Sequence, residues 1–490
     1  MSGRDGESNW EGSVFEVRLG SPGHGGFCVA RHEGRVLFVR HGLPGELVRA
    51  RVSEDRGGSF CRAEAVEILE ASPDRVPAIC PVSGPGGAGC CDFSFATPAA
   101  QRALKATVVS EQLRRVAAWE TDVVVEPIPG GEQDVGWRTR IRLVVDERGR
   151  AGVHRFRSTD IIADLRCPQP VSGALEGIAD RIWTPGADLV VAVDGDGMRH
   201  VVEVAPALVE HERRQGNSRA GNDRRARRSG EHGRGGEYGG GGERGRGGEY
   251  GRGGARYSGA GRREALHRAG ADRAGDRGST AARRAAAHAD RDERVIEGSG
   301  RAVQFVAGRR WEVSATGFWQ AHRGAAQCYS DVVAEWADPS PGDRAWDLYC
   351  GAGVFAARLA EAVGPAGAVL GVESARPAVA DGVAALRDLP WASLRADRVE
   401  RWIAGESGGA APDVVVLDPP RAGAGKAVVA ALTAAVPARI VHIGCDPAAF
   451  ARDISLYRAA GYAPTRLRAF DAFPGTHHVE CLTLLEPVRS

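Results

Sequence analysis

Alternating hydrophobic and polar positions predict a series of short β-strands near the start of the chain. Residues 14–19 alternate in this way, and the same pattern returns at 35–40, 48–52 and 63–69. Turns rich in glycine or proline separate these segments, as in small β-barrels. We therefore expect residues 9–70 to form a small all-β barrel.

A different pattern occupies the last third of the chain. Continuous apolar runs predict buried strands at 344–349, 368–373, 413–418 and 439–444, and the segments between them have helical spacing. Strands and helices that alternate like this form a doubly wound α/β sheet with mainly parallel strands. Residues 326–490 are therefore predicted to be an α/β domain.

The region between the barrel and the α/β domain has a mixed pattern. Residues 71–100 are rich in cysteine and glycine, 98–119 have helical spacing, and the stretch up to about 205 contains strand-like segments. We assign residues 71–207 to a central domain of mixed α and β structure. The chain is expected to return to this domain at 301–325.

Residues 208–300 differ in composition from the rest of the chain. The sequence Arg-Gly-Gly-Glu-Tyr-Gly begins at Arg234 and again at Arg246, and large apolar residues are scarce. Such a segment buries too little surface to offset the entropy of ordering, so we expect a long disordered insertion. Its excess of arginine and its tyrosines fit an RNA tether, and an inert surface expansion is the alternative. Residues 1–8 are also expected to be disordered.

The charge of the whole chain is nearly balanced, with 64 Lys and Arg residues against 63 Asp and Glu residues. This excludes a histone-like basic protein. Only Lys105 and Lys426 are lysines, which we attribute to a coding bias toward arginine. No apolar run approaches the ~18 residues of a membrane helix, and the N-terminus lacks the apolar stretch of a signal peptide. We expect a cytoplasmic protein, with no membrane attachment and no protein partner implied.

The first predicted strand of the α/β domain leads into Asp347-Leu-Tyr-Cys-Gly-Ala-Gly-Val-Phe355. Gly351 and Gly353 allow a tight turn and a close approach of the backbone to a ligand at the carboxyl edge of the sheet. Glu373 ends the next strand, where an acid can bind ribose hydroxyls. This pattern alone fits a nicotinamide-dependent enzyme as well as a methyltransferase.

Two later strands also end in residues with chemical potential. Asp418-Pro-Pro-Arg421 forms a rigid acidic loop at the carboxyl end of its strand, and Cys445 follows the next strand. Ligands bind at this edge of an open α/β sheet. A cysteine there becomes a nucleophile if a positive environment lowers its pKa, and the alternative is a buried, inert cysteine.

His477, His478 and Glu480 lie close together near the end of the chain. A metal site is one interpretation of two histidines and a carboxylate. Adjacent side chains on a strand point to opposite faces, however, so this interpretation is weak.

Taken in order, the motifs of this chain resemble those of the RNA uridine C5-methyltransferase family, which has tRNA and large-subunit rRNA members. The motifs are Gly317-Phe-Trp-Gln320, Asp347-Leu-Tyr-Cys-Gly351, Asp418-Pro-Pro-Arg421, Cys445-Asp-Pro-Ala448 and Phe473-Pro-Gly-Thr-His-His-Val-Glu480. The barrel looks like the TRAM domain of that family, an OB-like RNA-binding module. The similarity covers nearly the whole chain outside residues 208–300. It implies a class I, Rossmann-like methyltransferase fold for the α/β domain.

The resemblance also implies a reaction and a set of site residues. Cys445 would add to C6 of uracil, C5 would receive a methyl group from S-adenosylmethionine, and Glu480 would remove the C5 proton. The implied cofactor contacts are Gln320, Tyr349, Glu373, Asp418 and, as a weaker candidate, Asp397. The implied partner is RNA, either rRNA or tRNA, whose target base is flipped out of its stack.

Similar family members hold an iron–sulfur cluster with cysteines of the glycine-rich segment and one distant cysteine. The resemblance therefore makes Cys80, Cys90, Cys91 and Cys167 candidate ligands of a 4Fe–4S cluster. The usual middle position is Ala88 here, and adjacent ligands at 90 and 91 are awkward for a cubane site. A zinc site, or a decayed site that survives by packing alone, are the alternatives.

The sequence thus predicts an S-adenosylmethionine-dependent RNA uracil C5-methyltransferase. Two alternatives stay open. A cytosine C5-methyltransferase also uses a cysteine nucleophile, although the segment ending in Glu480 argues against it. An RNA-binding protein with an inactive methyltransferase domain is the other, and the intact Cys445, Asp418 and Glu480 argue against that. Which RNA and which uridine are modified cannot be predicted from short motifs.

Overall fold

The computed structural model describes residues 9–130, 134–206, 291–405 and 410–488. The chain divides into one unit of residues 1–205 and 293–490 and a second unit of residues 206–292. Nearly all of the second unit lies outside the described residues, as do residues 1–8. The expectations of disorder at 1–8 and over most of 208–300 therefore fall outside the description, which concerns the first unit.

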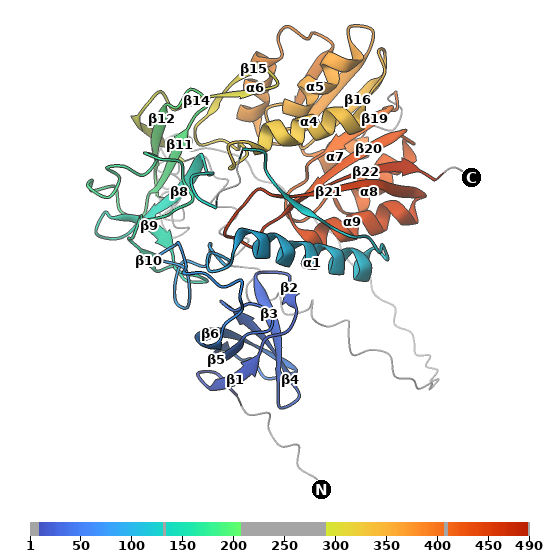
Figure 1. Cartoon of the computed structure of the whole chain (residues 1–490). Helices are drawn as coiled ribbons and strands as arrows, with labels where there is room; N and C mark the ends of the chain where they lie inside the picture. The colour runs from blue at the N-terminus through green and yellow to red at the C-terminus, as the bar shows by residue number, and fades with distance from the viewer. Residues whose placement is uncertain (1–8, 131–133, 207–290, 406–409, 489–490) are drawn as a thin grey trace, which may run out of the picture. The chain divides into compact units, whose positions relative to one another are not determined.

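The N-terminal segment forms the expected barrel as a curled sheet (Figure 1). Its strands are β1 (Val14–Arg18), β2 (Pro22–Gly23), β3 (Phe27–His32), β4 (Arg35–Arg40), β5 (Leu47–Glu54) and β6 (Phe60–Glu70), in the order β1-β5-β6-β4-β3-β2. Along β5, Val48, Ala50 and Val52 are buried, whereas Arg49 and Arg51 are exposed. This period of two places the apolar side chains inside the barrel, as the sequence pattern predicts.

Helix α1 (Pro98–Val116) follows the cysteine-rich segment. The Thr97 hydroxyl accepts a hydrogen bond from the amide of Ala100 and caps its first turn. The buried positions recur every three or four residues, at Gln101, Leu104, Lys105, Val109 and Leu113. This face packs against α9 of the α/β domain, so α1 covers the catalytic sheet.

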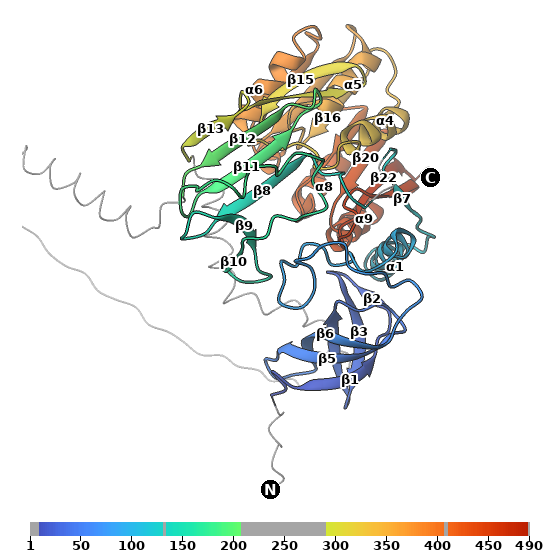
Figure 2. The same ribbon diagram turned by 60° about the vertical axis from the view of Figure 1, so that its left-hand side comes forward.

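The central domain is built on a mainly antiparallel sheet (Figure 2). Its strands are β8 (Arg140–Val145), β9 (Ala151–His154), β10 (Ile161–Ile162), β11 (Asp188–Val193), β12 (Arg199–Val204) and β13 (Glu293–Glu297), in the order β10-β9-β8-β11-β12-β13. We expected residues 208–300 to be disordered, but Glu293–Glu297 within this range form strand β13, so the expected insertion is too long at its C-terminal end. Its residues pair with β12, from Val204 opposite Glu293 onward, so pairing orders a segment that was assigned to disorder.

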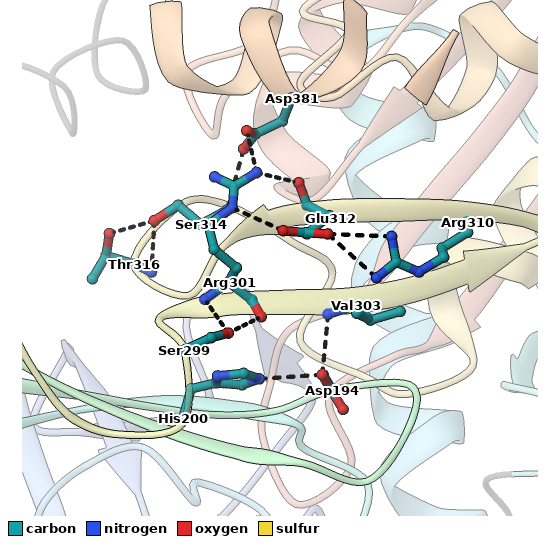
Figure 3. A network of polar contacts seen from close by, with 10 residues as sticks. All are labelled: Asp194, His200, Ser299, Arg301, Val303, Arg310, Glu312, Ser314, Thr316 and Asp381. Carbon is teal, nitrogen blue, oxygen red and sulfur yellow. Dashed lines mark hydrogen bonds and ion pairs between the residues drawn. The ribbon is translucent and has the colours of Figure 1, made fainter. Parts of the chain in front are cut away.

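A hairpin of β14 (Arg301–Val306) and β15 (Arg309–Ser314) connects the central sheet to the α/β domain. Figure 3 shows the polar contacts that hold it. Asp194 is buried, lies 3.1 Å from His200 and accepts a hydrogen bond from the amide of Val303. On the other side, Arg301 donates to Asp381 of α6 (Arg376–Ala385) at 2.7 Å. The hairpin is therefore fixed to both domains just before the cofactor-contacting segment.

The α/β domain has the expected doubly wound sheet. Its strands are β16 (Arg344–Leu348), β17 (Ala368–Glu373), β18 (Ala392–Ala396), β19 (Val414–Leu417), β20 (Arg439–Gly444), β21 (Tyr462–Asp471) and β22 (Glu480–Pro487). The order is β18-β17-β16-β19-β20-β22-β21-β7, and β22 runs antiparallel to β20 and β21. The edge strand β7 (Val125–Pro127) comes from a segment that we assigned to the central domain.

Helices cover both faces of this sheet. They are α4 (Ala325–Ala337), α5 (Val354–Val363), α6, α7 (Val399–Gly405), α8 (Gly425–Ala434) and α9 (Pro447–Ala459). Val414 and Val416 face the core formed with α4 and α5, whereas Val415 and Leu417 face the core formed with α7, α8 and α9. A strand that is buried on both faces has a continuous apolar run, which explains why this sheet is visible in the sequence.

Candidate active site

The two predicted catalytic residues lie on neighbouring strands at one edge of the sheet. Strands β20 and β22 pair with Gly444 opposite Cys481. Cys445 is the residue after β20, and Glu480 begins β22, so both lie at the same end of this strand pair. Glu480 is buried, and Cys445 is partly buried. Two residues that are 35 positions apart in the sequence are thus close enough for the charge of Glu480 to act on the thiol.

Glu480 shares its buried surroundings with a second carboxyl group. Burial raises the pKa of Glu480 well above its usual range, and the charge of Asp418 raises that pKa further, while Arg421 opposes the shift. Burial also raises the pKa of Asp418, to about 7. The site therefore favours protonated carboxyl groups near neutral pH, as is usual where two carboxyl groups are desolvated together.

The thiol of Cys445 lies in an acidic environment. Burial raises its pKa to about 12, the carboxyl groups of Glu480 and Asp418 add to the shift, and Arg421 lowers it. The positive environment that would activate a cysteine is therefore not present around Cys445 in this state. Burial is the largest cause, and three acids add to it: Glu480 and Asp418, which are distant in the sequence, and Asp446, the next residue.

Asp446, the residue after Cys445, fixes the turn on which the thiol lies. Its carboxylate caps α9 by accepting hydrogen bonds from the amides of Ala448 and Ala449 at 3.1 and 2.8 Å. The other oxygen lies 3.2 Å from Nε2 of His24, between β2 and β3 of the barrel. The barrel and the catalytic turn are thereby held together.

A cavity beside Asp418 combines apolar, aromatic and polar side chains. It is lined by Phe318, Trp319, Gln320, Ala326, Tyr349, Cys350, Gly351, Ala352, Val354, Phe355 and Asp418. Three of the predicted cofactor residues, Gln320, Tyr349 and Asp418, therefore meet at one cavity. The cavity residues Phe318, Trp319 and Gln320 are followed directly by Ala321. The central domain helps to hold this segment, because the amide of Thr139 donates to the carbonyl of Ala321 at 2.9 Å.

The loop that contains Gly351 and Gly353, named the glycine loop, precedes α5, and Gly351 lines the cavity. Gly353 has φ +77°, and a Cβ there would lie 3.0 Å from Leu394 and 3.2 Å from Leu386. Only glycine fits such a position without strain. Asp347 is fully buried and accepts a hydrogen bond from the amide of Ala356 at 2.8 Å, so it holds the start of α5 and does not reach the cavity.

Glu373 and Asp397 are not among the residues that line this cavity. Glu373 accepts hydrogen bonds from the amides of Gly351 and Ala375 at 3.2 and 2.7 Å. Asp397 is bound by Arg401 at 2.5 Å, and its amide donates to the carbonyl of Glu373 at 2.9 Å. Both acids therefore support the glycine loop from behind.

Sequence analysis missed the residues that hold the catalytic segment 473–480. Lys105 donates to the carbonyl of Phe473 at 3.1 Å, and Gln101 accepts from the amide of Gly475 at 2.7 Å. Asp92 lies 2.5 Å from Nδ1 of His477. These partners are more than 360 residues away in the sequence. The one available sign was that Lys105 is one of only two lysines in a chain that otherwise uses arginine.

Comparisons with known proteins give the family. The family model described as TRAM domain matches residues 10–66, and the one described as tRNA (Uracil-5-)-methyltransferase matches residues 410–488. An uncharacterized RNA methyltransferase of Streptomyces avermitilis is 37% identical over 97% of this chain and 99% of its own length. A relative from Streptomyces coelicolor with the same description is 38% identical over 97% of this chain and 93% of its own length. The chain belongs to the RNA uracil C5-methyltransferase family.

The fold of this methyltransferase also matches a solved structure. The tRNA (uracil-54, C5)-methyltransferase of Pyrococcus abyssi, solved with S-adenosyl-L-homocysteine, superposes with a TM-score of 0.60 at 18% identity. The match covers 96% of this chain and 100% of the other. The class I methyltransferase fold with an N-terminal TRAM domain is confirmed. The enzyme is an S-adenosylmethionine-dependent RNA methyltransferase, which excludes the nicotinamide-dependent alternative.

The cysteines of the methyltransferase do not support the predicted 4Fe–4S cluster. Hydrogen bonding from Cys91 lowers the pKa of Cys80 to about 6, and Cys91 also contacts Cys90. Burial raises the pKa of Cys167 to about 11. Within the described residues, however, no three histidine, cysteine or acidic side chains are placed to hold a metal ion. Cys167 interacts electrostatically with Cys90 and Cys80, and these two contact Cys91, but the described residues do not support a bound cluster.

The two adjacent histidines have separate partners. His477 is paired with Asp92, whereas His478 lies 3.4 Å from Arg421 and packs edge-on against Phe473. Burial lowers the pKa of His478 to about 3. The alternative metal site is therefore not formed by these residues. In the described residues, no helix of the methyltransferase is long and apolar enough to cross a membrane.

Proposed function

We propose that the enzyme transfers a methyl group to C5 of a uridine in RNA through a covalent bond between Cys445 and C6. The observation that carries this proposal is that Cys445 and Glu480 lie at the same end of the paired strands β20 and β22, where the charge of Glu480 acts on the thiol. Asp418 connects the pair to the cavity, since it lines the cavity and its charge acts on both residues. A nucleophile, a base and a methyl donor are thus expected to meet at one sheet edge.

The chemistry follows from the low nucleophilicity of uracil C5. Addition of the Cys445 sulfur to C6 breaks the C5–C6 double bond and moves its electron pair toward the C4 carbonyl, giving an enolate that is nucleophilic at C5. S-adenosylmethionine, when bound, supplies an electrophilic methyl group. After C5 is methylated, the ionised form of Glu480 takes the C5 proton, the double bond re-forms, and the sulfur leaves as thiolate.

The Cys445 thiol must lose its proton before or as its sulfur adds to C6. Because its pKa is raised to about 12 by burial and by the two acids, the thiol carries its proton in this state. We propose that the proton leaves as the bond to C6 forms, toward the carboxylate form of Asp418, which is still populated near neutral pH because its pKa is about 7. Arg421 is the neighbouring group whose charge favours the thiolate.

The residues that line the cavity are of the kinds that would bind S-adenosylmethionine. Aromatic walls from Phe318, Trp319 and Phe355 suit the adenine ring, and the glycine loop leaves room for a close approach of the backbone. We propose that Gln320, Tyr349 and Asp418 contact the cofactor. Glu373 is proposed to bind the ribose from the rim. Asp397, whose carboxylate is held by Arg401, is proposed to act through Glu373.

A trapping experiment tests this function. Cys445→Ala should abolish both methylation and any covalent RNA adduct. Glu480→Gln keeps the size of the side chain but removes the base, so this variant should transfer one methyl group and then stall with RNA attached to Cys445. A denaturing gel with methyl-labelled cofactor should show a slow labelled band for Glu480→Gln only. Methylation by Cys445→Ala would overturn the proposed chemistry.

A measurement of 5-methyluridine in cells identifies the RNA that this enzyme modifies. Both tRNA and rRNA are possible substrates of a uracil C5-methyltransferase. The experiment compares 5-methyluridine in the separated tRNA and rRNA of cells with and without this gene. The RNA that loses one 5-methyluridine is the substrate, and loss from neither fraction would contradict the proposal.

A further inference from the structure

Glu480 points to the face of the catalytic sheet that helix α4 covers. It begins strand β22, and Leu482 and Leu484 of the same strand belong to the hydrophobic core that α4 forms with this sheet. Successive side chains of a strand point to opposite faces, so Glu480 shares the face of these two leucines. Phe470 pairs directly with Glu480 across β21 and β22, and it belongs to the same core. The side chain of the proposed base therefore faces α4.

Tyr329 of α4 lies in this core next to the strand partner of Glu480. It is fully buried, and its ring centroid lies 5.9 Å from that of Phe470. Ala326, one helical turn earlier on α4, lines the cavity that Asp418 also lines. Tyr329 is therefore placed between the strand partner of the base and a wall of this cavity.

The hydroxyl of Tyr329 is buried and, within the residues that the structure describes, has no hydrogen-bond partner. Buried polar groups are almost always paired, and one that is not calls for a reason. Burial raises the pKa of Tyr329 well above its usual range, and so, in decreasing order, do the charges of Glu480, Cys328, Asp418 and Cys445. Three of these four groups are the active-site residues. The phenol keeps its proton, so its hydroxyl is a hydrogen-bond donor that the active-site charges reach.

The proposed reaction gives such a donor a task. Glu480 takes the C5 proton in its ionised form, but burial raises its pKa well above its usual range, and the charge of Asp418 raises it further. The charge of Arg421 opposes this shift. A hydrogen bond donated to a carboxylate also favours the ionised form. A neutral donor on the α4 side would therefore favour the form of Glu480 that acts as a base.

We propose that Tyr329 is a positioning residue for Glu480, whose carboxylate accepts a hydrogen bond from the Tyr329 hydroxyl when Glu480 ionises. The bond stabilises and orients the carboxylate until it takes the C5 proton. The phenol proton stays on Tyr329 throughout, so no covalent bond is made or broken beyond those of the proposed reaction. The inference rests on the proposed function, since it assigns a partner to the base of that reaction.

Tyr329→Phe in the full-length enzyme removes the hydroxyl and keeps the ring. Because the hydroxyl has no partner within the described residues, stability and the affinity for S-adenosyl-L-homocysteine should not decrease. The substrate is total RNA from cells that lack this gene. Turnover should fall about tenfold, as for the loss of one hydrogen bond to a charged group, whereas KM for this RNA should stay the same. Methylated RNA should accumulate on Cys445, because its release requires the base, and a denaturing gel with methyl-labelled cofactor measures this accumulation.

Tyr457→Phe is the matched control. Tyr457 is also fully buried, and its hydroxyl has no partner in the described part of the chain, but it belongs to the core on the other face of the sheet. Glu480 is not among the groups whose charges act on it. This variant should leave turnover and the amount of adduct unchanged. A general effect of losing a buried hydroxyl would appear in both variants.

The ionisation of Glu480 gives a readout that a merely structural role would not move. The infrared band of its protonated carboxyl group is identified by its loss in Glu480→Gln and is then followed against pH. Without the hydroxyl the ionised form loses a donor, so the midpoint should move to higher pH by about one unit in Tyr329→Phe. The other titratable groups that interact with Glu480 are unchanged in this variant; they are Asp418, Arg421, Cys445 and Cys481.

The outcomes separate this inference from the proposed function. An unchanged midpoint in Tyr329→Phe, or an equal shift in Tyr457→Phe, would overturn the role of Tyr329 even if Glu480→Gln traps the RNA adduct. A shifted midpoint in Tyr329→Phe alone would support that role even if no variant forms an adduct. The absence of an adduct would then contradict the proposed covalent chemistry and leave the contact between the two residues established.

Discussion

The ammonium group of Lys105 lies 2.5 Å from the carboxylate of Asp471, and both side chains are buried. Lys105 belongs to α1, and Asp471 ends β21, immediately before the catalytic segment. The same ammonium donates to the carbonyl of Phe473. One of the chain's two lysines is therefore the link between a helix near the N-terminus and the segment that carries Glu480.

Replacing Lys105 by Met should destabilise the enzyme by about 3–5 kcal/mol, because Asp471 would keep a buried charge without a partner. Lys105→Arg should also destabilise it, since a planar guanidinium is larger than the enclosed ammonium site. Chemical unfolding measures both. The double variant Lys105→Met/Asp471→Leu should recover part of the loss. Lys426→Met, the matched change at the other lysine, should be nearly neutral; an equal loss there would contradict this role for Lys105.

The reactivity of Cys445 should respond to its acidic neighbours. Because Glu480 and Asp418 raise the pKa of the thiol and Arg421 lowers it, Glu480→Gln and Asp418→Asn should each shift alkylation by iodoacetamide to lower pH. Arg421→Gln should shift it to higher pH. Mass spectrometry of the peptide that contains Cys445 measures the profile and distinguishes it from the exposed Cys90. Identical profiles in all three variants would show that these charges do not control the thiol.

Stability should decrease on acidification because of His442. Burial lowers the pKa of this histidine in the folded protein to about 3, below the 6.5 that is usual for an exposed histidine. The unfolded chain therefore binds more protons between these values, and stability is lost as the pH falls from about 6.5 toward 3, by up to about 1.4 kcal/mol per pH unit. The groups that face His442 are Asp453, 3.6 Å away, and the ring of Tyr457.

Unfolding measured at several pH values checks this expectation. His442→Leu should make the acid limb of the stability profile shallower. His154→Leu removes an exposed histidine and should leave the slope unchanged. If both variants keep the slope of the unsubstituted enzyme, another group controls the acid limb.

Gly353→Ala should weaken cofactor binding. The left-handed backbone costs a non-glycine residue about 1–2 kcal/mol, and the new Cβ would also press on Leu386 and Leu394 beside the cavity. Calorimetry with S-adenosyl-L-homocysteine measures the effect. Gly364→Ala is a matched control, because Gly364 has φ +65° but open space around it at the end of α5. It should lower stability and leave the affinity unchanged, and an equal loss of affinity would contradict a local effect.

The segment 207–290 should be replaceable by a short linker. Val204 and Glu293 are paired residues of β12 and β13, so the chain on both sides of the segment comes together. A Gly-Ser linker should therefore preserve the cooperative unfolding transition and the binding of S-adenosyl-L-homocysteine. A weaker and less salt-dependent affinity for RNA would support the tether, and an unchanged affinity would support the inert expansion. Loss of the folded state would contradict the expectation.

The sequence by itself determined the elements of the α/β sheet and the motifs at their ends. Strands such as β19 and β20 are buried on both faces, so their apolar runs are continuous and visible. Cys445, Glu480 and the glycine loop became candidates because each stands in a short motif beside one end of a strand. The insertion was recognised by its composition, but β13 was not, because its order comes from pairing with β12.

The tertiary structure alone decided which distant residues meet, and these contacts set the chemistry. The raised pKa of Cys445 comes from burial first and then from the distant Glu480 and Asp418, and Asp446 of its own motif adds to it, so the motif alone did not predict the shift. The contacts of Lys105 with Asp471 and of Tyr329 with Phe470 were likewise not predicted. The spacing of apolar residues along the chain predicts whether a segment is a helix or a strand and which of its faces is buried. Charge, desolvation and stacking depend on distances in space, and only the folded chain fixes those distances.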